Sequence, residues 1–331
     1  MKKLMVENTE SVIVSRMNFL RGLFAVLIVL GHCGRKFDIE PLVLLLPHKM
    51  NFVFVCYFFA VSGWSLSYNY EVKTNYLKNF WKRKIVKLAL LALETEAVTQ
   101  VAMKLIFKDS FYFNNSILTD VNWYIYEMIA LYIGFWLIYK TQKDMLKREI
   151  SVWIFSFGVA VFTWAMYKYG SWSGWTYAFY YSTMSFPLGI TIHRLMKQDL
   201  KIKKLYFIYL FILMGLSSLC MIMKKESFVG GIILHNLFGI CCMIILVMAL
   251  KIIDVRKAKL LSFFTGIATY IYLYQFVVMK GLSRLYQINN RSVDALYVIV
   301  AVLVTIIIAF LIKSFNMLIE EGIRLAGRKR V

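Results

Sequence analysis

Residues 294–313, DALYVIVAVLVTIIIAFLIK, decide the fold of this 331-residue chain, because nothing between the first aspartate and the last lysine is charged. A helix that crosses the hydrocarbon core of a bilayer needs about 20 mostly apolar residues. Water is absent there, so every backbone amide must find its partner within the segment, as it does in a helix. This stretch is therefore predicted to be a membrane-spanning helix.

Other apolar runs of similar length precede it, and the composition agrees with them. Hydrophobic residues make up 60% of the chain and charged residues 17%, with a mean hydropathy of +0.65. A soluble domain has roughly 45–50% apolar and 25% charged residues, which excludes an ordinary soluble enzyme and a disordered protein. We expect an all-α polytopic membrane protein with about ten transmembrane helices, at residues 17–33, 50–68, 85–105, 121–139, 150–167, 175–193, 205–223, 228–250, 260–280 and 294–313.

The positive charges predict the orientation in the membrane. Lys and Arg number 39 against 18 Asp and Glu, a net charge of +21. With a cytoplasmic N-terminus, 27 of the basic residues fall on the inner side and 11 on the outer side. Because Lys and Arg stay cytoplasmic, both termini are predicted to be cytoplasmic. No basic soluble domain gathers these charges and no loop is long enough for one, so we expect a single membrane domain over residues 1–331 and no nucleic-acid partner.

Arg21 and His32 are the first candidates for chemistry. An ionisable side chain at bilayer depth costs roughly 2.5–3.5 kcal/mol, so it indicates function. The two residues are eleven apart on one predicted helix, which places them within about 20° of the same face and about 16 Å apart. Arginine binds phosphate and histidine exchanges a proton near neutrality, so this face suits a phosphorylated ligand threaded through the membrane. Alternatively, the two residues simply mark the two interfaces. His193, near a span end, is expected to reach water and to carry little weight.

The second and third predicted helices add a small-residue motif and a basic cluster. Ser62 and Gly63 lie within the second run, where glycine permits close helix contact and serine bonds a neighbouring backbone. Arg83, Lys84 and Lys87 follow in the next loop. These three cations are either a phosphate site or an ordinary positive-inside cluster.

The fourth predicted helix carries a buried carboxylate candidate. It opens near Trp123, a typical interface residue, and then places Glu127 at membrane depth. Glu127 could pair with His32 and fix its tautomer, as a carboxylate does in a hydrolase triad. His235 is interpreted as a histidine satisfied within a helix contact.

The cysteines predict no metal site. The five are Cys33, Cys56, Cys220, Cys241 and Cys242, all within or at the ends of apolar runs and without a CxxC pair. Structural packing is the usual role of such residues, and we expect neither a disulfide framework nor a metal.

In their order, these motifs resemble the acyltransferase 3 family of bacterial membrane acyltransferases, across most of the chain. The matching elements are Arg21 and His32 as Arg-x10-His; Phe58, Phe59, Ser62, Gly63 and Trp64; the basic Arg83, Lys84 and Lys87; Trp123, Glu127 and Tyr132; and Gly266, Thr269, Tyr270, Tyr272 and Leu273.

Three departures from the family pattern stand out. Gln275 occupies the position of a late family histidine, Thr269 replaces a serine, and lysines replace an arginine pair. Glutamine cannot accept a proton at neutral pH, so a role for a second histidine is in doubt. Lysine still binds phosphate, but without the bidentate fork of arginine.

The resemblance implies an enzyme of the bacterial plasma membrane. Such an enzyme moves an acyl group, usually acetyl, from cytoplasmic acyl-CoA to a hydroxyl of an extracytoplasmic or lipid-linked glycan, without a metal. Its partners would be the glycan acceptor, the lipid bilayer, and a second copy or a glycan-assembly protein. The implied roles are His32 as base or acyl carrier, Glu127 as its partner, Arg21, Arg83, Lys84 and Lys87 at the CoA phosphates, and Ser62, Gly63, Trp123 and Tyr270 as substrate or structural residues. The alternatives are a transporter or flippase without covalent chemistry, and an inactive relative kept for assembly.

Overall fold

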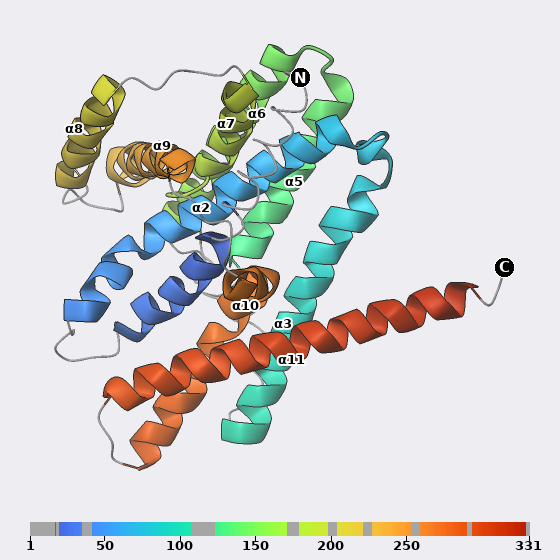
Figure 1. Ribbon diagram of the computed structural model, residues 1–331, viewed down its shortest axis with the longest axis vertical. Helices are drawn as coiled ribbons and strands as arrows, with labels where there is room; N and C mark the ends of the chain where they lie inside the picture. The colour runs from blue at the N-terminus through green and yellow to red at the C-terminus, as the bar shows by residue number, and fades with distance from the viewer. Residues whose placement is uncertain are drawn as a thin grey trace. The chain divides into compact units, whose positions relative to one another are not determined.

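The computed structural model describes residues 17, 20–34, 42–107, 123–170, 179–197, 204–220, 227–252, 259–289 and 293–328, and their regular structure is entirely helical (Figure 1). Every predicted apolar run contains a helix. A first helix spans Leu20–Gly34. It is followed by α2 (Leu42–Val72), η1 (Tyr76–Asn79), η2 (Trp81–Val86), α3 (Lys87–Phe107), α5 (Trp123–Thr141), α6 (Met145–Tyr169), α7 (Ser185–Lys197), α8 (Lys204–Cys220), η4 (Val229–Leu234), α9 (His235–Ile252), α10 (Lys259–Ile288) and α11 (Ala295–Arg328).

Four helical stretches within the described residues are long and apolar enough to cross a membrane. They are Pro47–Val72, Met145–Tyr169, Val229–Ala249 and Ala295–Gly322. The other predicted spans form helices that are shorter or more polar. The chain is thus an all-helical membrane protein, whereas the number of ten spans and the cytoplasmic termini remain predictions.

The helices form two compact units. Unit 1 comprises the described residues within 52–98 and 111–254. Unit 2 comprises residues 15–51, 99–110 and 255–331.

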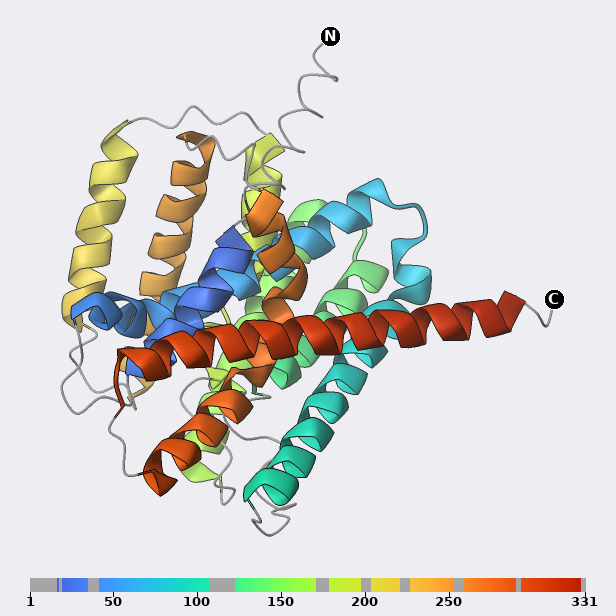
Figure 2. The same ribbon diagram turned by 60° about the horizontal axis from the view of Figure 1, so that its bottom comes forward.

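In unit 1, α6 packs beside both α5 and α7, and α9 packs beside α7 and α8 (Figure 2). Two glycines set a close crossing of α2 and α7. A Cβ atom at Gly63 would overlap the carbonyl oxygen of Phe186, and one at Gly189 would overlap that of Ala60. Glycine lets two helix backbones approach this closely in a membrane, as predicted for Gly63.

Helix ends differ from the predicted runs where polar residues extend or interrupt them. Helix α6 begins at Met145 rather than residue 150, because the Asp144 carboxylate accepts a hydrogen bond from the Lys147 backbone N–H at 2.7 Å and caps the helix. Helix α7 begins at Ser185, after bends and turns at residues 181–184, whereas the predicted run starts at residue 175 and its first four residues lie outside the described residues.

In unit 2, α11 packs along α10 (Figures 1 and 2). The helix Leu20–Gly34 also packs on α10, and this contact carries the candidate site.

Candidate functional site

Arg21 is held against α10 by a hydroxyl. Its Nη2 donates to Thr269 Oγ1 at 2.7 Å. One residue further on, a Cβ atom at Gly22 would lie 2.9 Å from the carbonyl carbon of Phe264, so only glycine allows this helix approach. Threonine in place of the family serine therefore keeps the group that positions the guanidinium.

His32 contacts the same helix two turns further along. Its ring centroid lies 4.7 Å from that of Phe276, at an interplanar angle of 57°. Thr269, which holds Arg21, and Phe276 are seven residues apart on α10, or about two turns. Arg21 and His32 therefore both face α10, and each is half-buried. This arrangement agrees with the shared face expected from their spacing.

Two buried side-chain amides in unit 2 have unused hydrogen-bonding capacity within the described structure. Asn51 is 6% exposed, and neither its Nδ2 nor its Oδ1 has a partner there. It abuts Gly31, the neighbour of His32, so closely that a Cβ atom at Gly31 would overlap the amide. Gln275 donates from Nε2 to the Tyr272 carbonyl at 2.9 Å, but its buried Oε1 has no partner. Buried polar groups are normally satisfied, so both amides are available to a ligand.

Sequence reasoning missed Asn51, although a single polar residue at the start of an apolar run was a visible signal. It also missed Lys313, which was counted only as one of the inner basic residues. The Lys313 ammonium on α11 lies 2.8 Å from where a Cβ atom at Gly266 would be. Gly266 is three residues before Thr269 on α10, so two cations, Lys313 and Arg21, lie near one turn of that helix.

Tyr270, a predicted motif residue, helps to join α10 and α11. Its hydroxyl accepts a hydrogen bond from Asn316 Nδ2 at 3.4 Å. The side chain is half-buried. The geometry therefore gives Tyr270 a structural contact beside the turn that holds Arg21.

In unit 1, Glu127 is buried, and only one of its two carboxylate oxygens has a hydrogen-bond partner within the described residues. Its Oε1 accepts from Thr183 Oγ1 at 2.5 Å, and Oε2 has no partner among the described residues. The proposed pairing with His32 joins residues of different units and remains a prediction. Trp123 is also buried, with its ring 5.9 Å from that of Phe179.

The predicted basic cluster lies on one helical stretch. Arg83 and Lys84 belong to the π-helix η2, and Lys87 starts α3. Arg83 and Lys87 are exposed, and Lys84 is half-buried. Nearby in η1, burial raises the pKa of the Tyr76 hydroxyl, so this group adds no negative charge beside the cations. Ser62, on α2, is half-buried beside Gly63.

The expectation for His193 was wrong. The side chain is 2% exposed rather than snorkelled to water. Its Nδ1 bonds Ser67 Oγ at 3.0 Å, its Nε2 lies 4.0 Å from Glu71 Oε2, and its ring meets Trp64 edge to face. Packing between α2 and α7 covers it, which distance from a span end does not reveal. His235 is buried as expected, with Nδ1 2.7 Å from the Gly230 carbonyl oxygen.

No group of three His, Cys, Asp or Glu side chains suitable for a metal occurs in the described parts of the chain. A family model described as an acyltransferase domain matches residues 14–313, nearly the whole chain. No curated protein and no solved structure matches the sequence.

Proposed function

Since the chain belongs to the acyltransferase 3 family, we propose that it is a membrane O-acyltransferase of the bacterial plasma membrane. It moves an acyl group, most simply acetyl, from cytoplasmic acyl-CoA to a hydroxyl of an extracytoplasmic or lipid-linked polysaccharide. The observation that carries the proposal is the alignment of Arg21 and His32 on α10, a fixed cation and a proton acceptor on one face.

Arg21 has the chemistry to hold an anionic end of the donor. A guanidinium is a planar fork of five N–H donors, and Thr269 Oγ1 accepts from one of them here. Such a fork suits phosphate oxygens. Arg83, Lys84 and Lys87 supply further positive charge at a predicted cytoplasmic surface, so they attract the phosphates of acyl-CoA.

His32 acts on the acceptor hydroxyl. As general base it takes the hydroxyl proton while the oxygen attacks the thioester carbon. A C–O bond forms, the C–S bond breaks, and the proton passes to the departing thiolate. A second route has the imidazole carry the acyl group transiently before the hydroxyl receives it. In both routes the Asn51 amide, beside Gly31, is a suitable donor for the carbonyl oxygen as negative charge develops.

Labelled acetyl-CoA tests the proposal. Membranes that contain the protein and its native glycan should transfer label to the glycan, whereas a transporter or flippase would move the glycan unlabelled. A His32→Ala variant should accumulate normally but lose transfer. His48→Ala is the matched control, because His48 is another half-buried histidine of unit 2. Normal acylation by the His32→Ala variant would refute the catalytic assignment.

A further inference from the structure

Unit 1 contains a cavity to which no role has yet been assigned. Its volume is about 40 Å³, or about 330 Å³ when the space open to solvent is included. It lies where the end of α2, the end of α5, the start of α6 and part of α7 meet, and Ser67, Tyr70, Tyr139, Arg148 and Arg194 are among its lining residues. We name it the Arg148 pocket. We propose that it binds the phosphate group of a cytoplasmic ligand.

Arg148 is the cation that the pocket presents. Its guanidinium lies 5.1 Å from the ring centre of Tyr70 and 5.0 Å from that of Tyr139. These two rings meet edge to face at 4.8 Å and form a support for the charge. Its Nε–H donates weakly to the Asp144 carbonyl at 3.4 Å, and no carboxylate within the described residues forms an ion pair with it. The other guanidinium N–H groups are available to a ligand.

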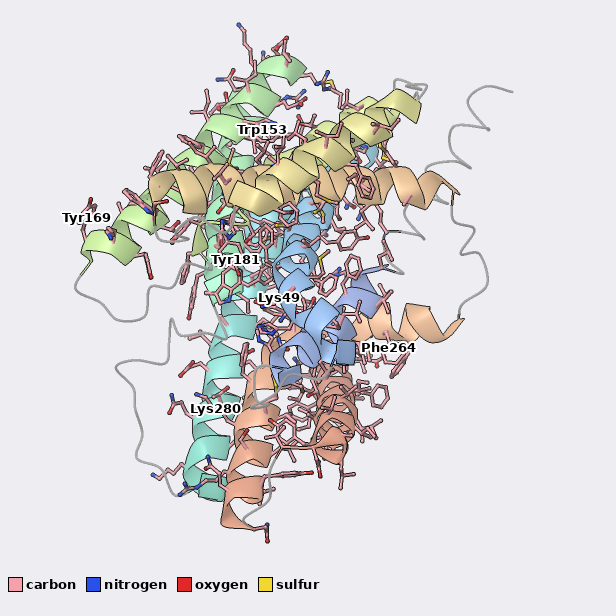
Figure 3. The ribbon with its side chains drawn as sticks, turned by 90° about the vertical axis from the view of Figure 1, so that its left-hand side faces the viewer. Lys49, Trp153, Tyr169, Tyr181, Phe264 and Lys280 are labelled. Atoms are coloured by element: carbon pink, nitrogen blue, oxygen red, sulfur yellow. The ribbon has the colours of Figure 1, made fainter. Side chains whose placement is uncertain are left out.

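The nearest buried carboxylate is already neutralised. Glu149 is 7% exposed, and its Oε2 lies 2.6 Å from Arg194 Nε. Its Oε1 accepts from Arg194 Nη2 at 3.2 Å and from Thr191 Oγ1 at 2.5 Å. Trp153, labelled in Figure 3, in turn donates to the Thr191 hydroxyl at 3.0 Å and fixes it. With Glu149 bound in this way, the charge of Arg148 is not cancelled.

Hydroxyl groups complete the lining. Ser67 Oγ is hydrogen-bonded to His193 Nδ1 at 3.0 Å, so its position is fixed. The tyrosine hydroxyls of Tyr70 and Tyr139 also belong to the lining, and hydroxyls and a guanidinium fork are donors that phosphate oxygens accept. Glu71 also lines the pocket, 31% exposed and with Oε2 4.0 Å from His193 Nε2, so its charge opposes an anion there and weakens the attraction of Arg148.

Basic residues around the pocket indicate that it opens toward the cytoplasm. The segments 69–87 and 140–148 flank the pocket and together hold ten basic residues against the acidic Glu71 and Asp144. Both segments are predicted to be cytoplasmic. Two sources offer a phosphate there, namely the acyl donor, which rests on the proposed function, and the headgroup of an inner-leaflet phospholipid.

Binding of acetyl-CoA to the purified full-length protein in detergent tests the first source. Arg148→Gln should weaken binding roughly 10- to 100-fold, as expected for loss of a charge-assisted contact. Lys147→Gln is the matched control, since it removes the same charge from the adjacent exposed position outside the pocket, and it should change affinity less than about twofold. Acetyl-dephospho-CoA, which lacks the 3′-phosphate, should bind equally to both variants if that phosphate occupies the pocket.

Native mass spectrometry tests the second source. Phosphatidylglycerol should form an adduct that diacylglycerol with the same chains does not form, and Arg148→Gln should lose it while Lys147→Gln keeps it. If Arg148→Gln weakens acetyl-CoA binding, the pocket binds the acyl donor. If Arg148→Gln loses the phosphatidylglycerol adduct, the pocket binds a lipid headgroup. If Arg148→Gln and Lys147→Gln bind acetyl-CoA equally well and form the same lipid adduct, the inference is overturned.

Two further variants protect the test against a folding defect. Arg148→Lys keeps the charge and most of the packing but not the fork, so it should bind several-fold less tightly than the wild type. Glu71→Gln removes a negative charge from the lining and should tighten binding, and unchanged or weaker binding would contradict the inference. If the wild type neither binds acetyl-CoA nor acylates glycan, the proposed function fails, yet the lipid experiment still decides the pocket.

Discussion

Alanine at Gly63 or Gly189 adds a methyl group where α2 and α7 cross in unit 1. At Gly189 that methyl would lie 2.7 Å from the carbonyl carbon of Ala60 and 2.9 Å from the Trp64 nitrogen, and at Gly63 it would lie 3.0 Å from the carbonyl carbon of Phe186. These neighbours are backbone atoms, so they cannot move aside as a flexible side chain does. Overpacking typically costs about 1–3 kcal/mol, and we expect each variant to reach the upper half of that range.

Gly158→Ala is the matched control, because nothing lies within 4 Å of the added methyl group in α6. Alanine is the better helix former, so this variant should be neutral or more stable by up to about 1 kcal/mol. The double variant of Gly63 and Gly189 should cost less than the sum of the single changes, since one separation of α2 from α7 relieves both overlaps.

The assay is unfolding of the purified protein in mixed micelles with rising SDS, followed by tryptophan fluorescence. Both crossing variants should unfold at a clearly lower SDS fraction than Gly158→Ala. Equal midpoints for the three single variants would refute the close crossing. If the Gly63→Ala protein has normal stability but no acylation activity, Gly63 contacts the substrate rather than serving helix packing.

The remaining predictions concern buried polar groups. Asn51→Leu removes an amide without a partner in the described structure, so the free energy of unfolding should be unchanged or higher by about 1 kcal/mol, while glycan acylation falls at least tenfold. Glu127→Gln should accumulate normally in the membrane but lose acylation, as measured with labelled acetyl-CoA, because a neutral amide cannot stabilise a charged histidine. Arg194→Gln leaves Glu149 buried without its cation and should lower the free energy of unfolding by about 1–3 kcal/mol, less than for a fully buried pair because Arg194 is 27% exposed.

Each of these predictions has an outcome that contradicts it. For Asn51→Leu, a large loss of stability would show that the amide stabilises the fold. Full acylation activity would show that Asn51 is not part of the site. For Glu127→Gln it is unimpaired transfer. For Arg194→Gln it is wild-type stability, which would make the ion pair with Glu149 energetically neutral.

Apolar length predicted the helices well because the bilayer imposes one requirement on every span. The ends were harder, since they depend on local polar groups: the Asp144 side chain starts α6 five residues before the apolar run. The two units were not predicted, because division into units depends on contacts between helices far apart in the sequence.

The site could be predicted in part. The shared face of Arg21 and His32 followed from helical periodicity alone. The hydroxyl that holds Arg21 is 248 residues away, so spacing could not identify it, although the family motif had included Thr269. Asn51 was visible as a polar residue, but its missing partner is a property of packing. His193 was misjudged for the same reason, because neighbouring helices bury it.

Helix α11 continues for 34 residues, or about 50 Å at the rise of an α-helix, against a hydrocarbon core of about 30 Å. Its later turns carry Glu320 and Glu321, both exposed, so the rod extends well past the lipid tails. A fluorescent protein or phosphatase fused after this rod would stand clear of the headgroups and fold without steric hindrance. Its signal would then report directly which compartment receives the end of the helix.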